Sequence, residues 1–298
     1  MVLTITDAGR TVKLGFTGDV GRPGRPILRD PQPMADCDVL ITESTYGGTV
    51  HDPPSTSKEG LEAVITRTSK RGGRVIIPAF SVGRTQEIVY ALDQLVNEDR
   101  LPPIPVYVDS PLAVNATGIY QAHPECYDAE LREYLRTDPN PFGFERLTYV
   151  RDAEKSKALN GMRVPMVIIS ASGMCEAGRI LHHLRNNIED DRNTVLIVGY
   201  CADHTLGKRI VERRPEVKIF GDPHPLRAEV EVMNAYSGHA DEPYLLDFIG
   251  QLDRDRLRRI FLVHGAPERQ DAFQRALRTA GHANVLIPNR GESVRLSA

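Results

Sequence analysis

The 298-residue chain carries 37 Lys and Arg residues against 40 Asp and Glu residues, a formal net charge of −3 at pH 7. This balance excludes a strongly basic nucleic-acid-binding protein, although a local basic groove is compatible with it. No stretch of 18 apolar residues is present, so no membrane span is expected. The first residues lack the apolar segment of a signal peptide, and the four cysteines form no CxxC pair. We therefore expect a cytoplasmic protein with reduced thiols.

Short apolar runs alternate with longer amphipathic runs along the chain. In chain order, the predicted elements are strands at 11–18 and 38–44, a helix at 57–71, a strand at 74–80, a helix at 83–98, strands at 104–110 and 165–172, a helix at 178–188, strands at 193–200, 217–221 and 228–237, a helix at 241–252, a strand at 259–265, a helix at 267–281 and a strand at 284–288. Several strands are continuous Val, Ile and Leu runs, typical of strands buried on both faces. The alternation predicts an α/β protein.

The domain organisation follows from where this alternation is regular. Residues 58–190 alternate evenly between strand and helix, whereas the stretches on both sides are richer in strands. We therefore predict a division into residues 1–57, 58–190 and 191–298, in which the middle segment is a unit of its own.

Polar residues follow many of the predicted strands. Asp19 and Glu43 stand at the ends of the first two strands, and His239 and His264 follow strands near the C-terminus. Ligand-binding groups in α/β sheets gather at the carboxyl ends of strands. A carboxylate and two imidazoles are ligand types that zinc prefers. Taken singly, each is better explained as a hydrogen-bonded turn residue, and Glu43 as a carboxylate that caps backbone N–H groups.

A second pattern indicates an anion site. The "SASGMCEAGR" segment places Ser170, Ser172 and Gly173 just before a predicted helix, where backbone N–H groups can bind a phosphate or form an ordinary helix cap. Arg84 and Arg179 open helices, where a cation opposes the macrodipole, so either an anionic partner or plain solvation is expected there.

The remaining histidines carry no predicted function. His182 and His183 are adjacent on a helix, so their side chains face different sides and cannot act as a pair. The others are expected in loops or at the surface: His51, His123, His204, His224 and His282.

Eight ordered strings resemble the β-CASP group of metallo-β-lactamase-fold nucleases. They are "FTGDVG", "ESTYGG", "PAFSVGRTQE", "VDSPLA", "SASGMCEAGR", "GYCADHTLG", "YSGHADE" and "VHGAPE", and they span nearly the whole chain. The group includes bacterial ribonuclease J, archaeal relatives and the endonuclease subunit of the mRNA 3′-end cleavage machinery. The resemblance implies a partial metallo-β-lactamase αββα core into which an α/β β-CASP domain is inserted, at about 58–190.

The resemblance also implies roles for the residues singled out above. Asp19 would bridge two zinc ions, and His264 would be the terminal zinc ligand. Glu43 would support the catalytic histidine, and His239 would contact the scissile phosphate and assist as an acid. The loop that contains Ser170 would hold an RNA phosphate. The implied activity is zinc-dependent hydrolysis of RNA phosphodiesters, in an endo- or a 5′-exonucleolytic mode.

One departure from the family pattern is large. Family members carry a His-x-His-x-Asp-His motif and a further histidine before the bridging aspartate, and this sequence contains no such motif. Asp19 and His264 supply two ligands across two metals, where a catalytic zinc usually has three each. The core sheet would also lose its first strands, which exposes apolar surface and an unpaired edge. A gene fragment, one half of a split enzyme and a degenerate relative each fit, and we expect the fragment.

Two function classes follow, with a more distant third. The first is a zinc-dependent ribonuclease, although the isolated chain is expected to bind zinc poorly. The second is a non-catalytic RNA-binding subunit of a processing complex. The third is a metal-independent α/β phosphate-binding enzyme, which would explain the serine loop but neither histidine motif. The expected partners are single-stranded RNA, a second copy of the chain as a homodimer, and the missing N-terminal segment in cis or in trans. No membrane partner is expected.

Overall fold

The computed structural model describes residues 1–51, 57–233 and 236–296. The chain divides into a first unit, Met1–Arg25, Asp30–His51 and Gly238–Ala298, and a second unit, Pro26–Arg29 and Asp52–Ser237. The sequence predicted that the inserted unit ends near residue 190. In the structure it continues to Ser237, because β8 (Thr194–Ile197) pairs with β4 (Val75–Pro78) and β11 (Glu229–Val232) pairs with β8.

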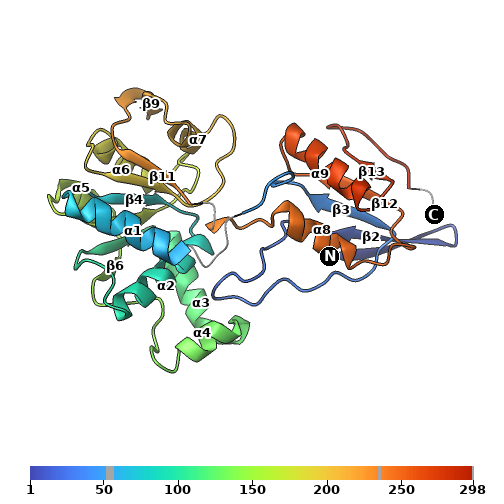
Figure 1. Ribbon diagram of the computed structural model, residues 1–298, viewed down its shortest axis with the longest axis horizontal. Helices are drawn as coiled ribbons and strands as arrows, with labels where there is room; N and C mark the ends of the chain where they lie inside the picture. Colours follow the sequence, from blue (N-terminus) through green and yellow to red (C-terminus); the bar gives the residue numbers. More distant parts are fainter. Residues whose placement is uncertain (52–56, 234–235, 297–298) are drawn as a thin grey trace. The chain divides into compact units, whose positions relative to one another are not determined.

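A five-stranded sheet forms the centre of the first unit (Figure 1). Its order is β1 (Val2–Asp7), β2 (Arg10–Phe16), β3 (Val39–Glu43), β12 (Arg259–Val263) and β13 (Val285–Leu286). β1 and β2 form an antiparallel hairpin, and the other neighbouring pairs are parallel. Because β2, β3 and β12 run in the same direction, the residues that follow them meet at one edge of the sheet.

Two helices cover one face of this sheet. They are α8 (Glu242–Gly250) and α9 (Pro267–Thr279). Leu40 and Leu262 of the sheet share a buried cluster with Phe248 of α8 and Phe273 of α9. The apolar residues that recur at helical spacing in these two segments are thus the ones that pack against the sheet.

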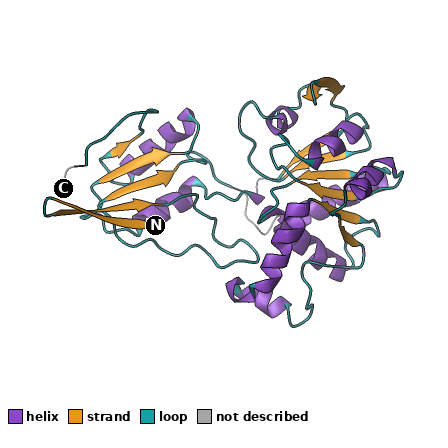
Figure 2. Cartoon of the chain, turned by 180° about the vertical axis from the view of Figure 1, so that it is seen from behind, coloured by secondary structure: helices purple, strands orange, loops and turns teal. Residues whose placement is uncertain are grey.

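Both helices lie on the same side of the sheet (Figure 2), and large apolar side chains on its opposite face are exposed. Leu3 is 45% exposed, Phe16 42% and Leu286 40%, and the strand register places these three on the same face. β1 forms an edge of the sheet. The sequence-based expectation of exposed apolar surface and an unpaired edge matches this arrangement.

This face leads to a solubility prediction. Replacing Phe16 by lysine is expected to reduce self-association of the chain, since it places a charge in the centre of an exposed apolar patch. The free energy of unfolding should change by less than about 1 kcal/mol, because the side chain is already exposed. Static light scattering against concentration measures the first effect and urea unfolding the second. Unchanged association would show that this face does not drive it.

A six-stranded, fully parallel sheet forms the centre of the second unit. Its order is β11, β8, β4, β7 (Val167–Ser170), β5 (Val106–Asp109) and β6 (Leu147–Tyr149). A separate antiparallel hairpin is formed by β9 (Glu216–Ile219) and β10 (Asp222–Pro225). Strands that alternate with helices and pair in parallel confirm the predicted α/β class.

Helices cover both faces of the six-stranded sheet (Figure 1). On one side, Val75 and Ile77 share a buried cluster with residues of α1 (Ser57–Lys70) and α2 (Arg84–Asn97). On the other, Ile76 and Ile168 pack with residues of α5 (Ala153–Gly161), α6 (Arg179–Asn187) and α7 (Leu206–Val211). Successive strand residues point to opposite faces, which explains why these strands are apolar throughout.

Some elements were not predicted from the sequence. They are β1, β6, β10, α5, α7, α3 (Pro111–Ala122), α4 (Ala129–Tyr134) and the short 3₁₀ helix η2 (Pro124–Cys126). α3 starts where the Ser110 hydroxyl accepts a hydrogen bond from the Ala113 N–H and Pro111 occupies the first turn. The strand predicted at 228–237 ends at Val232, and residues 234–235 lie outside the described part. Among the described helices, none has the length and apolar character needed to span a bilayer.

Candidate functional site

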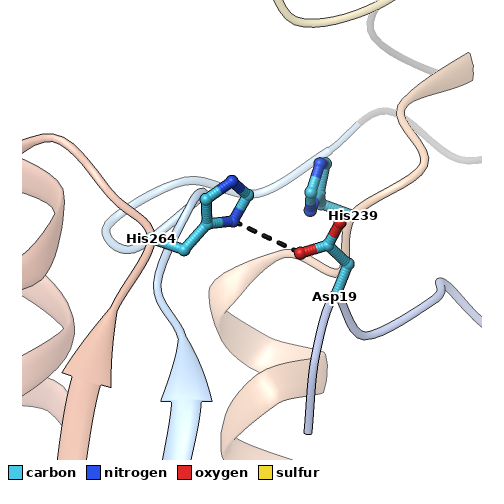
Figure 3. Close-up of side chains that lie close together, drawn as sticks. All are labelled: Asp19, His239 and His264. Carbon is cyan, nitrogen blue, oxygen red and sulfur yellow. Dashed lines mark ion pairs between the residues drawn. The ribbon is translucent and has the colours of Figure 1, made fainter.

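Three potential metal ligands converge in the first unit. Asp19, His239 and His264 each offer one ligand atom, and these atoms lie within 4.8 Å of one another. Oδ1 of Asp19 is 3.3 Å from Nδ1 of His264, and the two imidazole centroids are 5.6 Å apart. Figure 3 shows the three side chains approaching one another from separate segments. Asp19 and His264 are exposed, whereas His239 is partly buried.

The sheet topology explains this convergence. Asp19 follows β2, and His264 directly follows β12. β3 lies between these two strands and pairs in parallel with both, so all three end at the same edge. His239 lies in the segment that leads into α8. Residues more than 200 positions apart therefore meet because their strands share an edge.

Glu43 lies behind this cluster and holds it. Its side chain is 1% exposed, and Oε2 lies 2.9 Å from Nδ1 of His239. The Thr45 hydroxyl donates to the same oxygen, and the Val20 N–H donates to Oε1. A carboxylate can only accept, so the Nδ1–H of His239 donates to Glu43 and the orientation of the ring is set. Nε2 is then the nitrogen available for ligand or proton chemistry.

Opposing effects act on the pKa of His239. Burial lowers it, but the hydrogen bond that His239 donates to Glu43 and the negative charges of Glu43 and Asp19 outweigh burial. The net pKa of His239 is raised above its ordinary value. The imidazolium form, which a proton donor requires, therefore persists to higher pH than in an ordinary histidine.

Two glycines of the recognised strings allow the site loops to pack. A Cβ on Gly265 would lie 2.7 Å from the carbonyl oxygen of Ser44, and one on Gly47 would clash with the carbonyl of Arg269. The "ESTYGG" and "VHG" strings therefore require glycine for close backbone contact, next to Glu43 and His264 respectively.

His51 belongs to this region, although the sequence analysis placed it at the surface. It is 8% exposed, and its ring lies edge-on to Tyr46 with centroids 4.2 Å apart. Its backbone N–H donates to Asp241, which also caps α8. Tyr46 is itself close to His239, with centroids 6.3 Å apart. The tyrosine of "ESTYGG" was the signal that could have indicated an aromatic side chain packed beside His239.

The predicted phosphate loop lies in the second unit, where β7 ends. Ser170 is buried and donates to the Asp109 carbonyl, and the Ser172 hydroxyl accepts from the Glu176 N–H. Both hydroxyls thus stabilise the loop itself. In the described part of the chain, the N–H groups of Gly173 and Met174 form no hydrogen bond. A Cβ on Gly173 would press against Phe80, so glycine keeps this turn closed.

The two arginines proposed as anion ligands have internal partners. Arg84 is 6% exposed, forms an ion pair with Glu87 at 2.7 Å and lies over the Tyr236 ring. Arg179 pairs with Asp109 at 2.6 Å and donates to two backbone carbonyls. Both guanidinium groups therefore form contacts within the second unit and stabilise it.

Asp109 is the centre of a network that the sequence analysis did not identify. Its buried carboxylate accepts from Arg179, from the Ser156 hydroxyl and from Nε2 of His183, at 2.5–2.6 Å. Burial raises the pKa of Asp109, but the hydrogen bonds from His183, Ser156 and Arg179 outweigh it, so the net pKa is lowered. This network anchors both ends of the phosphate loop, through the Asp109 carbonyl at Ser170 and the Asp109 carboxylate at Arg179.

Two family models match the chain. The Beta-Casp domain matches residues 85–210, and the Zn-dependent metallo-hydrolase RNA specificity domain matches residues 223–288. The first lies within the six-stranded unit, and the second includes the segments that carry His239 and His264.

Curated relatives agree with these models. A ribonuclease of Thermus thermophilus is 38% identical over 96% of this chain and 64% of its own length. The transcription termination factor FttA of Methanosarcina mazei is 32% identical over 84% of this chain and 40% of its own length. An RNase J-like protein of Methanocaldococcus jannaschii is 29% identical over 94% and 64%. The chain thus spans less than two thirds of each relative. The ordered motifs, the two family models and these relatives agree, and the chain belongs to the β-CASP family of the metallo-β-lactamase fold.

Proposed function

We propose that this chain carries part of the active site of a zinc-dependent ribonuclease that hydrolyses RNA phosphodiester bonds. The observation that carries the proposal is the convergence of Asp19, His239 and His264 within 4.8 Å, with buried Glu43 orienting one of the imidazoles. A carboxylate oxygen and imidazole nitrogens fit zinc chemically. Asp19 and His264 would hold the metal, as the exposed members of the cluster.

The chain's own groups have separable roles in this proposal. Bound zinc would polarise the phosphate and lower the pKa of a coordinated water. His239 holds a proton at Nε2 and faces the reacting phosphate, where it stabilises charge or protonates the leaving oxygen. Glu43 keeps His239 in that orientation and favours the imidazolium form. The free N–H groups of Gly173 and Met174 would bind an RNA phosphate within the second unit.

The described residues provide too few ligands for a site that holds two zinc ions. Among the described residues, no further group of three His, Cys, Asp or Glu side chains is placed to hold a metal. A two-zinc site needs more ligands than Asp19 and His264 provide. We propose that a His-x-His-x-Asp-His segment outside these 298 residues, joined in cis or supplied in trans, completes it. The working location would be the cytoplasm and the substrate single-stranded RNA.

Metal binding and RNA cleavage test this proposal together. The 298-residue chain should bind zinc weakly and cleave labelled RNA negligibly. A chimera in which a family member's His-x-His-x-Asp-His segment precedes Met1 should bind two zinc ions and cleave RNA. Asp19→Ala in that chimera should remove at least one zinc, measured by elemental analysis. Tight binding of two zinc ions by the chain alone, with strong cleavage, would contradict the proposal.

A second candidate is a non-catalytic RNA-binding subunit of the same fold, which the absent His-x-His-x-Asp-His motif favours. Such a subunit has no chemical need for Asp19, His239 and His264 in one cluster. If the chimera binds RNA and zinc but cleaves nothing, this second function replaces the first.

A further inference from the structure

A polar cavity of about 370 Å³ lies in the second unit, at the edge of the sheet where its strands begin. Its lining includes residues that precede β4, β7 and β8 and residues that end α5 and α6. The phosphate loop lies at the opposite edge, where β7 ends. The cavity is therefore separate from every residue assigned to the proposed ribonuclease site.

The charges that line this cavity do not balance. Three guanidinium groups, of Arg74, Arg163 and Arg192, face one carboxylate, of Asp190. Asp190 is already paired with Arg192 at 2.7 Å. Across the described residues, no carboxylate forms an ion pair with Arg74 or Arg163. The charge of Asp190 also acts on Arg74, so the lining as a whole carries two more positive charges than negative ones.

Buried amides fix one of these cations in place. The Arg74 guanidinium donates to Oδ1 of Asn187 at 3.1 Å, and its backbone N–H donates to Oδ1 of Asn193 at 2.8 Å. Asn187 and Asn193 are 2% and 4% exposed. Burial and the nearby charge of Arg163 lower the pKa of Arg74 and outweigh the opposite effect of Asp190. The arrangement holds positive charges close together at a cost that a bound anion would remove.

We propose that this cavity binds the phosphomonoester dianion of a small molecule, such as a nucleoside 5′-monophosphate. A phosphomonoester carries close to two negative charges at neutral pH, which matches the net excess of two positive charges in the lining. Guanidinium groups bind phosphate oxygens in a planar, two-pronged geometry. The volume is in the range of small-molecule sites and exceeds what inorganic phosphate needs. The phosphodiesters of an RNA backbone carry one charge each and match less well.

Calorimetric titration of the full chain tests this site. The probes are inorganic phosphate, adenosine 5′-monophosphate and a dinucleotide without terminal phosphate. We expect adenosine monophosphate to bind, and the dinucleotide to give no saturable heat. Arg163→Ala should weaken binding roughly tenfold or more, since it removes a charge-assisted contact. Arg163 is exposed, so the variant should fold, which circular dichroism checks.

The matched control is Arg185→Ala, which removes the same charge from an exposed position on α6 outside the cavity lining. This variant should bind the mononucleotide as the unmodified chain does. Inorganic phosphate that binds as tightly as the mononucleotide would identify free phosphate as the ligand of the same site. Mononucleotide binding that Arg163→Ala leaves unchanged, absent binding, or equal binding of the dinucleotide would overturn the proposal. None of these outcomes depends on ribonuclease activity.

Discussion

Replacing His239 by alanine in the completed chimera is expected to lower RNA turnover about 10²- to 10⁴-fold, the range for loss of a general acid or base. The zinc content should stay nearly unchanged. Nδ1 of His239 is committed to Glu43, which fixes the ring and leaves Nε2 in place to donate a proton. Single-turnover cleavage of labelled RNA gives the rate, and elemental analysis gives the zinc content.

The control for this prediction is Glu43→Gln, which keeps the shape of the side chain but removes the charge that orients His239. It should lower turnover less than His239→Ala and shift the pH profile of cleavage to lower pH, because the pKa of His239 loses its support from Glu43. A large loss of zinc in His239→Ala would show instead that His239 is a ligand. Its place within 4.8 Å of Asp19 and His264 makes this measurement decisive.

Replacing Asp109 by asparagine is expected to lower the free energy of unfolding by about 3 kcal/mol, the lower end of the range for breaking a buried ion pair. The variant leaves the cation of Arg179 and the ring of His183 without their shared carboxylate. The lower end applies because the Arg179 side chain is 21% exposed. Urea unfolding followed by circular dichroism measures the change.

Ser156→Ala provides the matched control, since it removes one hydrogen bond to the same carboxylate and should cost about 1 kcal/mol. The two variants should also differ in acid. The pKa of Asp109 is lowered on folding, so its contribution is complete above about pH 4 and is lost as the pH falls through the lower folded value. The stability gap between the unmodified chain and Asp109→Asn should narrow below that pH. If the difference in unfolding free energy between the two proteins stays constant as the pH falls, the charge of Asp109 does not stabilise the fold.

Local sequence patterns predicted most of the elements that form the two sheets. The strand at 38–44 and the helix at 57–71 correspond to β3 and α1 within a few residues. α3 and α5 were not predicted, because their stretches contain Gly118, Thr117 and Asn160, which are weak helix formers. Their start is set by the Ser110 and Asp152 caps. The predicted domain boundary near residue 190 was too early, because β8 pairs with β4, which lies more than 100 residues before it in the sequence. A local sequence pattern does not record such a pairing.

The sequence by itself determined the family and predicted the side chains of the site, since Asp19, Glu43, His239 and His264 stand in ordered strings with distinctive glycines. Only the tertiary structure decided which side chains contact one another. It buried His51 beside Tyr46, turned Arg84 and Arg179 into internal ion-pair partners, and gathered the cations around Arg74 at the far edge of the sheet. The physical reason is that parallel strand pairing and burial act between residues distant in sequence, whereas motifs record the types of side chain and their local spacing.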